Sequence, residues 1–317
     1  MSDLDAPTDA AIELRLWRQF LTLAETLHFG RAAAQLHMTQ PPLSLAMQQL
    51  ERRLGHPVFE RSRRGVALTA AGAALVEPVR QLLRQAAALP AVASAASLGE
   101  TGRVRLGFVS TVGFGPLPGW LLQFRDANPA VSVALREATG DVQLAAFAQR
   151  ELDAGFLLHA PGMAPDGSTG LQRLSLGGEP LLLALPTSLP WSSAVRLKAA
   201  TLLAQPLVIF PRLIAPSLYD AVLAFYHRHG VTPTIAQEAI QMQTIVNLVS
   251  AGLGLAWVPR SMTLLQRAGV VYRPLPAALA DAAPRSETSL VWPADAPPAV
   301  LRFVDFVRER SARPRAA

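Results

Sequence analysis

The stretch that decides the fold is HFGRAAAQLHMTQPPLSLAMQQLERRLGHPVFERSRRGVALTAAG, residues 28–72. Residues 14–27 carry Leu and Phe at helical spacing, and residues 31–36 predict a second short helix that breaks at His37. Thr39 can cap a third helix, and the two prolines after it fall in the first turn, where a missing N–H costs little. Two short helices, a tight turn and a helix with a polar start are typical of a helix-turn-helix.

The third helix predicts two different faces. Leu43, Met47 and Leu50 share one helical face and are expected to be buried, which leaves Gln40, Ser44, Leu45 and Gln48 on the opposite face. Residues 58–60 and 66–68 flank Arg61-Ser62-Arg63-Arg64-Gly65, which predicts a β-hairpin with a cationic tip. Residues 1–69 are therefore expected to form a winged helix-turn-helix.

The chemistry of these residue types favours DNA as the partner. Gln and Ser at the start of a helix in the major groove can reach base edges, and Leu45 can meet a thymine methyl group. Arginines at a hairpin tip can neutralise phosphates or enter the minor groove, and the adjacent charges of Arg63 and Arg64 repel each other unless an anion is near. For Arg52 and Arg53, a role as solvated surface charges is equally open.

Residues 28–72 resemble the amino-terminal signature of the LysR-type transcriptional regulators. The pattern runs Phe-x-x-Ala-Ala-x-x-Leu, Ser/Thr-Gln-Pro-x-x-Ser, Leu-Glu-x-x-Leu-Gly, Leu-Phe-x-Arg and Leu-Thr-x-x-Gly, in register throughout. Many members place a basic residue after the motif serine, where this chain has Leu45, so a direct guanine contact is not expected there. The resemblance implies that Thr39, Gln40, Ser44 and Gln48 face the DNA from the recognition helix and that Arg63 and Arg64 lie in the wing. Pro41, Leu45 and Arg31 complete the set of candidate DNA-binding residues.

Composition limits the other possibilities. The 317 residues are 50% hydrophobic and 16% charged, enough for one or two sizeable cores, which argues against a disordered or fibrous chain. The chain has no cysteine, which excludes disulfides, thiolate catalysis and Cys-ligated zinc. The first fifteen residues hold four acids and no apolar run, and no uncharged stretch reaches the roughly 18 residues of a membrane span. A soluble cytoplasmic protein is expected.

Residues 70–98 predict a long helix that links two parts of the chain. Thr69 can cap it, while Pro78 and Pro90 predict a bend or break. Its apolar positions follow the 4,3,4,3 spacing of a coiled-coil seam, which could pair two copies of the chain or pack on its own domain as an ordinary amphipathic helix. The seam positions are Leu68, Gly72, Leu75, Val79, Leu82, Ala86, Leu89 and Ala93.

From residue 99 the pattern alternates between strands and helices, which predicts parallel sheets with ligands at the carboxyl ends of strands. Two such groups predict two α/β lobes with a cleft, lobe I at about 99–176 and 282–317 and lobe II at about 177–281. The resemblance implies that this effector-binding domain is similar to periplasmic binding proteins. The whole is an α+β multidomain protein: winged helix-turn-helix, linker helix and two-lobed α/β domain.

In the expected effector-binding domain, four stretches carry polar residues at the end of a predicted strand or at the start of a predicted helix. Hydroxyls and backbone donors at such junctions can bind a small anion, most simply a carboxylate. The resemblance implies that an effector lies between them, and the candidate residues are Ser110, Thr111, Thr139, Phe210, Arg212, Met242 and Gln243. Arg212 could pair with the effector or lie on the rim of the cleft.

Enzyme motifs are absent from the sequence. His227 and His229 point apart on a helix, the other four histidines are scattered, and no Gly-x-Ser-x-Gly, Walker or His-Glu-x-x-His motif occurs. We expect no catalysis, cofactor or metal. The expected partners are double-stranded operator DNA, a small effector, a second copy in a homodimer or homotetramer, and RNA polymerase. The alternative is a solute-binding or enzymatic α/β protein with a helical N-terminal adaptor for proteins.

Overall fold

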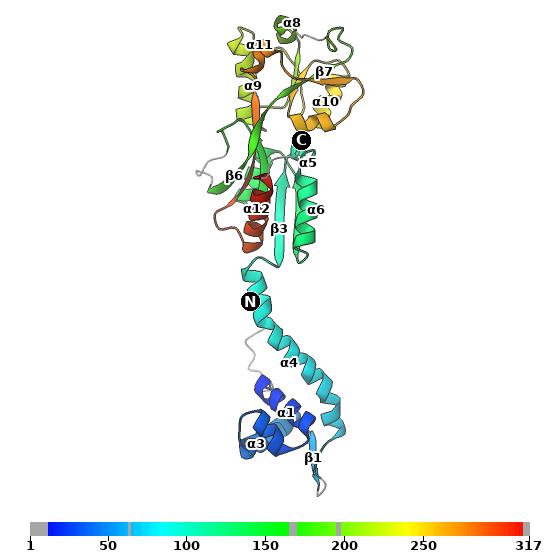
Figure 1. Ribbon diagram of the computed structural model, residues 1–317, viewed down its shortest axis with the longest axis vertical. Helices are drawn as coiled ribbons and strands as arrows, with labels where there is room; N and C mark the ends of the chain where they lie inside the picture. Colours follow the sequence, from blue (N-terminus) through cyan, green and yellow to red (C-terminus); the bar gives the residue numbers. More distant parts are fainter. Residues whose placement is uncertain (1–11, 63–64, 165–169, 195–197, 313–317) are drawn as a thin grey trace. The chain divides into compact units, whose positions relative to one another are not determined.

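The computed structural model describes residues 12–62, 65–164, 170–194 and 198–312 (Figure 1). The chain divides into two compact units, residues 1–94 and 95–317, and each is described by itself. Among the described residues, no helix combines the length and the apolar character needed to cross a membrane.

The first unit is the expected winged helix-turn-helix. Its helices are α1 (Leu14–Thr26), α2 (Phe29–Gln35) and α3 (Gln40–Leu54), and its antiparallel strands are β1 (Phe59–Ser62) and β2 (Gly65–Leu68). Thr39 lies at the N-cap of α3 as predicted, but its side chain makes no capping hydrogen bond, because Pro41 and Pro42 leave fewer N–H groups to cap.

The core of this unit holds α3 and the hairpin together. Leu43, Met47 and Leu50 are buried, as expected. One carboxylate oxygen of Glu51 accepts hydrogen bonds from the backbone N–H groups of Val58 and Phe59, at 2.9 and 3.1 Å. The end of α3 is therefore tied to the start of β1.

The linker helix α4 (Ala70–Ser97) is continuous, so the predicted break is wrong. Pro78 and Pro90 lie inside it, and each removes one backbone N–H donor without ending the helix. Thr69 caps it as predicted, since its Oγ1 accepts from the N–H of Gly72 at 3.0 Å.

The apolar seam of α4 has two parts. Gly72 and Val79 are buried against the core of the first unit, whereas Leu82 and Leu89 are 39% and 65% exposed. A Cβ on Gly72 would lie 2.1 Å from the carbonyl oxygen of Val58, so only glycine fits this approach. The first part of the seam therefore packs on the helix's own domain. For the second part, pairing with another copy of the chain stays a prediction.

One sheet of the second unit has the strand order β4-β3-β5-β12-β6. The strands β3 (Gly102–Phe108), β4 (Val131–Glu137) and β5 (Ala154–His159) are parallel, as predicted, while β12 (Arg285–Pro293) runs antiparallel to β5 and to β6 (Leu171–Pro180). The helices that accompany this sheet are α5 (Ser110–Gly113), α6 (Leu117–Ala127), α7 (Gly140–Ala148) and α12 (Pro298–Ser311). Helices α6 and α12 share one core with the sheet, which includes Phe124, Phe156 and Phe303.

A second core forms between residues 181 and 279. Here β7 (Leu182–Pro186) pairs antiparallel with β10 (Ala256–Val258) and β11 (Val270–Arg273), while β8 (Leu207–Ile209) and β9 (Ile235–Glu238) are parallel. The expectation of wholly parallel sheets is therefore wrong, because antiparallel strands need no crossover helix between them. The helices of this part are α8 (Ala199–Leu203), α9 (Pro216–Arg228), α10 (Met242–Ser250), the 3-10 helix Arg260–Leu264 and α11 (Ala277–Ala280).

Strands β6 and β12 connect the two cores. They are paired from Leu171↔Pro293 to Pro180↔Arg285, with a register irregularity between Glu287 and Ser289. The chain reaches the second core along β6 and returns along β12, so the two α/β lobes share a double connection. This arrangement brings the carboxyl ends of β3 and β4 close to β8 and α10, where the pocket described below lies.

Candidate functional site

The first candidate site is the exposed face of α3. Thr39, Gln40, Pro41 and Gln48 are exposed, Leu45 is 53% exposed and Ser44 is half-buried. The helix is amphipathic as predicted, so its buried face anchors it and its other face presents polar groups to a partner. Exposed Gln side chains near the start of a helix are chemically able to donate to and accept from the edges of bases in the major groove.

Arg61 connects this face to the wing. Its Nη2 donates a hydrogen bond of 2.8 Å to Oγ of Ser44, and its guanidinium lies 4.1 Å above the ring centroid of Phe29. Phe29 is buried at the start of α2, so one side chain from β1 contacts two helices. The sequence placed Arg61 only in the expected cationic hairpin tip, and its position in the Leu-Phe-x-Arg motif was the signal for this separate contact with Ser44 and Phe29. Ser44 accepts this bond and can still donate its own hydroxyl hydrogen.

The other arginines of the segment have different surroundings. Arg31 is exposed and donates to the carbonyl oxygen of Thr26 at 3.0 Å, at the end of α1. Arg52 and Arg53 lie in the last turn of α3, where positive charge interacts favourably with the helix dipole. Arg63 and Arg64 lie outside the described residues.

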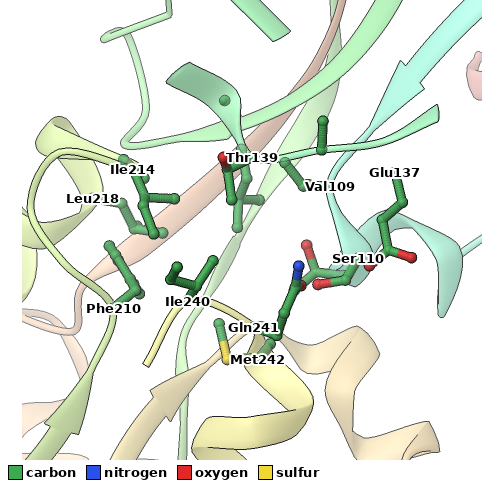
Figure 2. A pocket seen from close by; sticks show the side chains of 15 residues that line it. Val109, Ser110, Glu137, Thr139, Phe210, Ile214, Leu218, Ile240, Gln241 and Met242 are labelled. Atoms are coloured by element: carbon green, nitrogen blue, oxygen red, sulfur yellow. The ribbon is translucent and has the colours of Figure 1, made fainter. Parts of the chain in front are cut away.

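The second candidate site is a pocket between the two lobes of the second unit, partly open to solvent (Figure 2). It brings together Ser110, Thr111, Thr139, Phe210 and Met242 of the predicted effector residues, whereas Arg212 and Gln243 do not line it. The complete lining is Val109, Ser110, Thr111, Glu137, Ala138, Thr139, Gly140, Leu158, Phe210, Ile214, Ala215, Leu218, Ile240, Gln241 and Met242.

Arg212 is held by an acid outside the cavity. Its Nε and Nη2 donate to the two carboxylate oxygens of Asp220, both at 2.8 Å. The hydrogen bond from Arg212 lowers the pKa of Asp220, and the pair is largely exposed. Arg212 therefore occupies the rim, which is the second of the two positions expected for it.

One end of the cavity is polar. The side chains of Glu137, Ser110 and Gln241 lie near one another there (Figure 2). Thr111 is 5% exposed, and its Oγ1 has no hydrogen-bond partner among the described residues. Thr139 and Gln241 are the N-cap residues of α7 and α10, and neither side chain makes a capping bond. Backbone N–H groups at both helix starts are thus available to a ligand.

The opposite end is apolar. Phe210, Ile214, Leu218 and Ile240 lie together on the other side of the cavity (Figure 2). Phe210 and Leu218 are buried, and the ring of Phe210 meets that of Tyr219 edge-on at 6.3 Å. A ligand that fills the cavity must therefore carry an apolar part as well as polar groups.

Nothing in the described part of the chain suggests a metal centre, since no group of three or more His, Asp or Glu side chains converges there. Asp153 instead makes an ion pair: its carboxylate accepts from the backbone N–H and the guanidinium of Arg105, at 2.5 to 3.0 Å. Burial alone would raise the pKa of Asp153, but the hydrogen bonds and charge of Arg105 outweigh it and lower this pKa.

Comparisons with known proteins find matches for both parts of the chain. Residues 14–73 match the bacterial regulatory helix-turn-helix proteins of the lysR family, and residues 97–312 match the LysR substrate binding domain. The HTH-type transcriptional regulator IlvR of Caulobacter vibrioides is 41% identical over 304 residues, which cover 96% of this chain and 100% of that protein. The regulator YnfL of Escherichia coli strain K12 is 37% identical, over 89% of this chain and 92% of its own.

Solved structures give the same result. Full-length CbnR in complex with its target DNA is similar at a TM-score of 0.77 and 29% identity, covering 95% of this chain and 100% of that one. CbnR described as a LysR family transcriptional regulator is similar at a TM-score of 0.74 and 30% identity, covering 94% of this chain and 100% of that one.

Proposed function

The chain belongs to the LysR family of bacterial regulatory helix-turn-helix proteins, and on that premise we propose how its parts divide the work of a transcription regulator. Residues 1–69 bind operator DNA, residues 70–98 pair two copies, and residues 99–317 bind an effector. The relatives are transcriptional regulators, and this chain is a regulator rather than an enzyme. We place its activity in the cytoplasm with the bacterial chromosome, with RNA polymerase as a further partner.

The observation that carries DNA binding is the exposed polar face of α3, held in place by Arg61. Gln40 and Gln48 can read base edges, Ser44 can donate to a base acceptor, and Leu45 can meet a thymine methyl group. Thr39 and Pro41 lie at the start of α3, and we assign them, with the exposed Arg31 of α2, to phosphate contacts that fix register. We assign Arg63 and Arg64 to the phosphates or the minor groove by their place in the hairpin.

A salt titration tests this function against the alternative of a protein-binding adaptor. The expected result is that the logarithm of the affinity for duplex DNA falls linearly and steeply with the logarithm of the salt concentration, because Arg side chains displace counterions. Fluorescence anisotropy of labelled duplexes measures it. An adaptor for proteins would bind no duplex at any salt concentration.

Pairing of two copies is proposed for the second part of α4, where Leu82 and Leu89 are exposed. Leu82→Asp would bury an unpaired carboxylate at the seam, costing about 3 kcal/mol or more, and should shift dimers or tetramers towards monomers in sedimentation. Gln85→Asp adds the same charge next to the seam and should leave the mass unchanged. An unchanged mass for Leu82→Asp would contradict pairing through this seam.

The effector is proposed to be a small molecule with a carboxylate, bound by Ser110, Thr111, Thr139, Phe210 and Met242. The starts of α7 and α10 favour negative charge, which supports this assignment. Arg212 and Gln243 do not line the cavity, so they are not part of the proposed contact set. An effector can change DNA affinity only if it binds two states of the protein unequally, and contacts from both lobes make this difference achievable.

A further inference from the structure

We propose that the ligand of this pocket is an α-amino acid with an apolar side chain, whose ammonium group is bound by Glu137. The inference rests on the proposed function in one respect: it takes the same pocket as the effector site. It adds the chemical class of the ligand, which the family match leaves open.

The first step concerns charge. Glu137 is the only charged residue among the described residues that line the cavity. The guanidinium of Arg212, the one cation among the predicted effector residues, is committed to Asp220 through two hydrogen bonds of 2.8 Å. A ligand with a carboxylate alone would bring a second negative charge towards the exposed carboxylate of Glu137 with no cation in the lining, and two like charges at short range repel each other. An ammonium group on the ligand removes this conflict.

The second step concerns the carboxylate. Glu137 ends β4, and Thr139 and Gly140 begin α7 only two residues later, so an acceptor and a helix start are adjacent. The starts of α7 and α10 both line the cavity. Their N-cap residues, Thr139 and Gln241, make no side-chain hydrogen bond to the helix backbone. Thr111 independently points to a ligand, since its Oγ1 is buried in the lining without a partner. In an α-amino acid the carboxylate lies next to the ammonium group. The pocket offers the matching pair, with N–H and hydroxyl donors for the carboxylate and the Glu137 carboxylate as acceptor for the ammonium group.

The third step concerns the body of the ligand. Phe210, Ile214 and Leu218 lie at the end of the cavity opposite Glu137 and Ser110 (Figure 2). An α-amino acid places an ammonium and a carboxylate on one carbon and its side chain away from both. The separation of polar and apolar ends in the cavity therefore fits an apolar amino acid better than a dicarboxylate or a polar sugar.

Calorimetry on the full-length protein tests the proposal with two matched sets of probes. The first set is norleucine, hexanoate and pentylamine, and the second is phenylalanine, 3-phenylpropanoate and 2-phenylethylamine. In each set the carbon skeleton is constant, and the carboxylate or the amine is removed. We expect the amino acid of at least one set to bind at least about tenfold more tightly than both relatives, since each lacks one charged hydrogen-bonding group.

Two variants localise the effect. Glu137→Gln should weaken binding of that amino acid by about tenfold and bring it close to the matching carboxylate. Glu151→Gln is the control, because Glu151 is an exposed acid that pairs with Arg136 and does not line the cavity. Its affinities should equal those of the unaltered protein.

The outcomes separate this proposal from the proposed function. Equal binding of amino acid and carboxylate, or an unchanged affinity in Glu137→Gln, overturns the ligand class. Failure of all six probes in a protein that still binds duplex with a steep salt dependence overturns it too, and leaves the regulator intact. Binding of an amino acid by a protein that binds no duplex supports the ligand class and contradicts the proposed function instead.

Discussion

The face of α3 and the pocket between the lobes are built in opposite ways. The face takes its residues from one stretch, Thr39 to Gln48, with one addition, Arg61. The pocket takes its lining from segments as far apart as Val109 and Met242. A site on one helix depends on local periodicity, whereas a site assembled from strand ends depends on sheet register and loop paths. The difference teaches that the two sites can be damaged separately.

The two sites also rest on different cores. The core under α3 includes Val79 of α4, and the pocket lies between the cores centred on Phe303 and Phe225. If these foundations are independent, a change in one core should spare the other site. The following variants test this from the largest expected effect to the smallest.

Gly72→Val should break the DNA face alone. Its Cβ would lie 2.1 Å from the carbonyl oxygen of Val58, so the hairpin or α4 must shift, at a cost of about 3 kcal/mol or more. Hydrogen exchange should show loss of protection across residues 14–68 and none across residues 102–159. Ala73→Val changes an exposed neighbour in α4 and should have little effect. Loss of protection in both regions would show that the units unfold together.

Asp153→Asn should weaken the lobe that carries one side of the pocket and spare the DNA face. It removes the charge that holds Arg105, which should lower the free energy of unfolding of this unit by about 2 kcal/mol. Because the pKa of Asp153 is lowered on folding, its stabilisation is present above the ordinary value of 3.8 and is lost as pH falls through the lowered pKa.

Calorimetric melting at several pH values measures this effect. The difference between the unaltered protein and Asp153→Asn should be constant near neutral pH and should shrink below pH 3.8. Arg150 and Asp295 form an exposed pair in the same lobe, so Asp295→Asn is a control with little expected effect. A gap that widens on acidification would contradict the assigned sign.

Gln40→Ala sharpens the comparison on the DNA side. It should weaken binding to the specific site by about 1 to 2 kcal/mol and leave random duplex unchanged, because it removes a base contact. Arg61→Ala should weaken both, since it releases Ser44 and Phe29 as well as a charge. Anisotropy titrations on both duplexes measure this. Equal losses on the two duplexes for Gln40→Ala would remove Gln40 from base readout.

The sequence predicted the local site far better than the assembled one, for physical reasons. The burial of Leu43, Met47 and Leu50 follows from helical spacing alone, and the structure confirms it. Strands as short as Ala256–Val258 have too few residues to show a period, so the antiparallel sheet around β7 went unpredicted. Glu137 and Ile240 were not predicted from the sequence as lining residues of the pocket. They reach it only through the end of β4 and the turn before α10.

The ribbon of β6 and β12 has a mechanical consequence. A ribbon of two hydrogen-bonded strands resists sliding of one strand along the other, because sliding breaks the hydrogen bonds between them, but it can bend out of its own plane. The regular pairing of this ribbon is interrupted between Glu287 and Ser289, where Gly178 lies opposite Glu287 and the neighbouring Gly177 has φ 95°. A bend of the ribbon at this bulge would bring the two ends of the pocket closer together or move them apart.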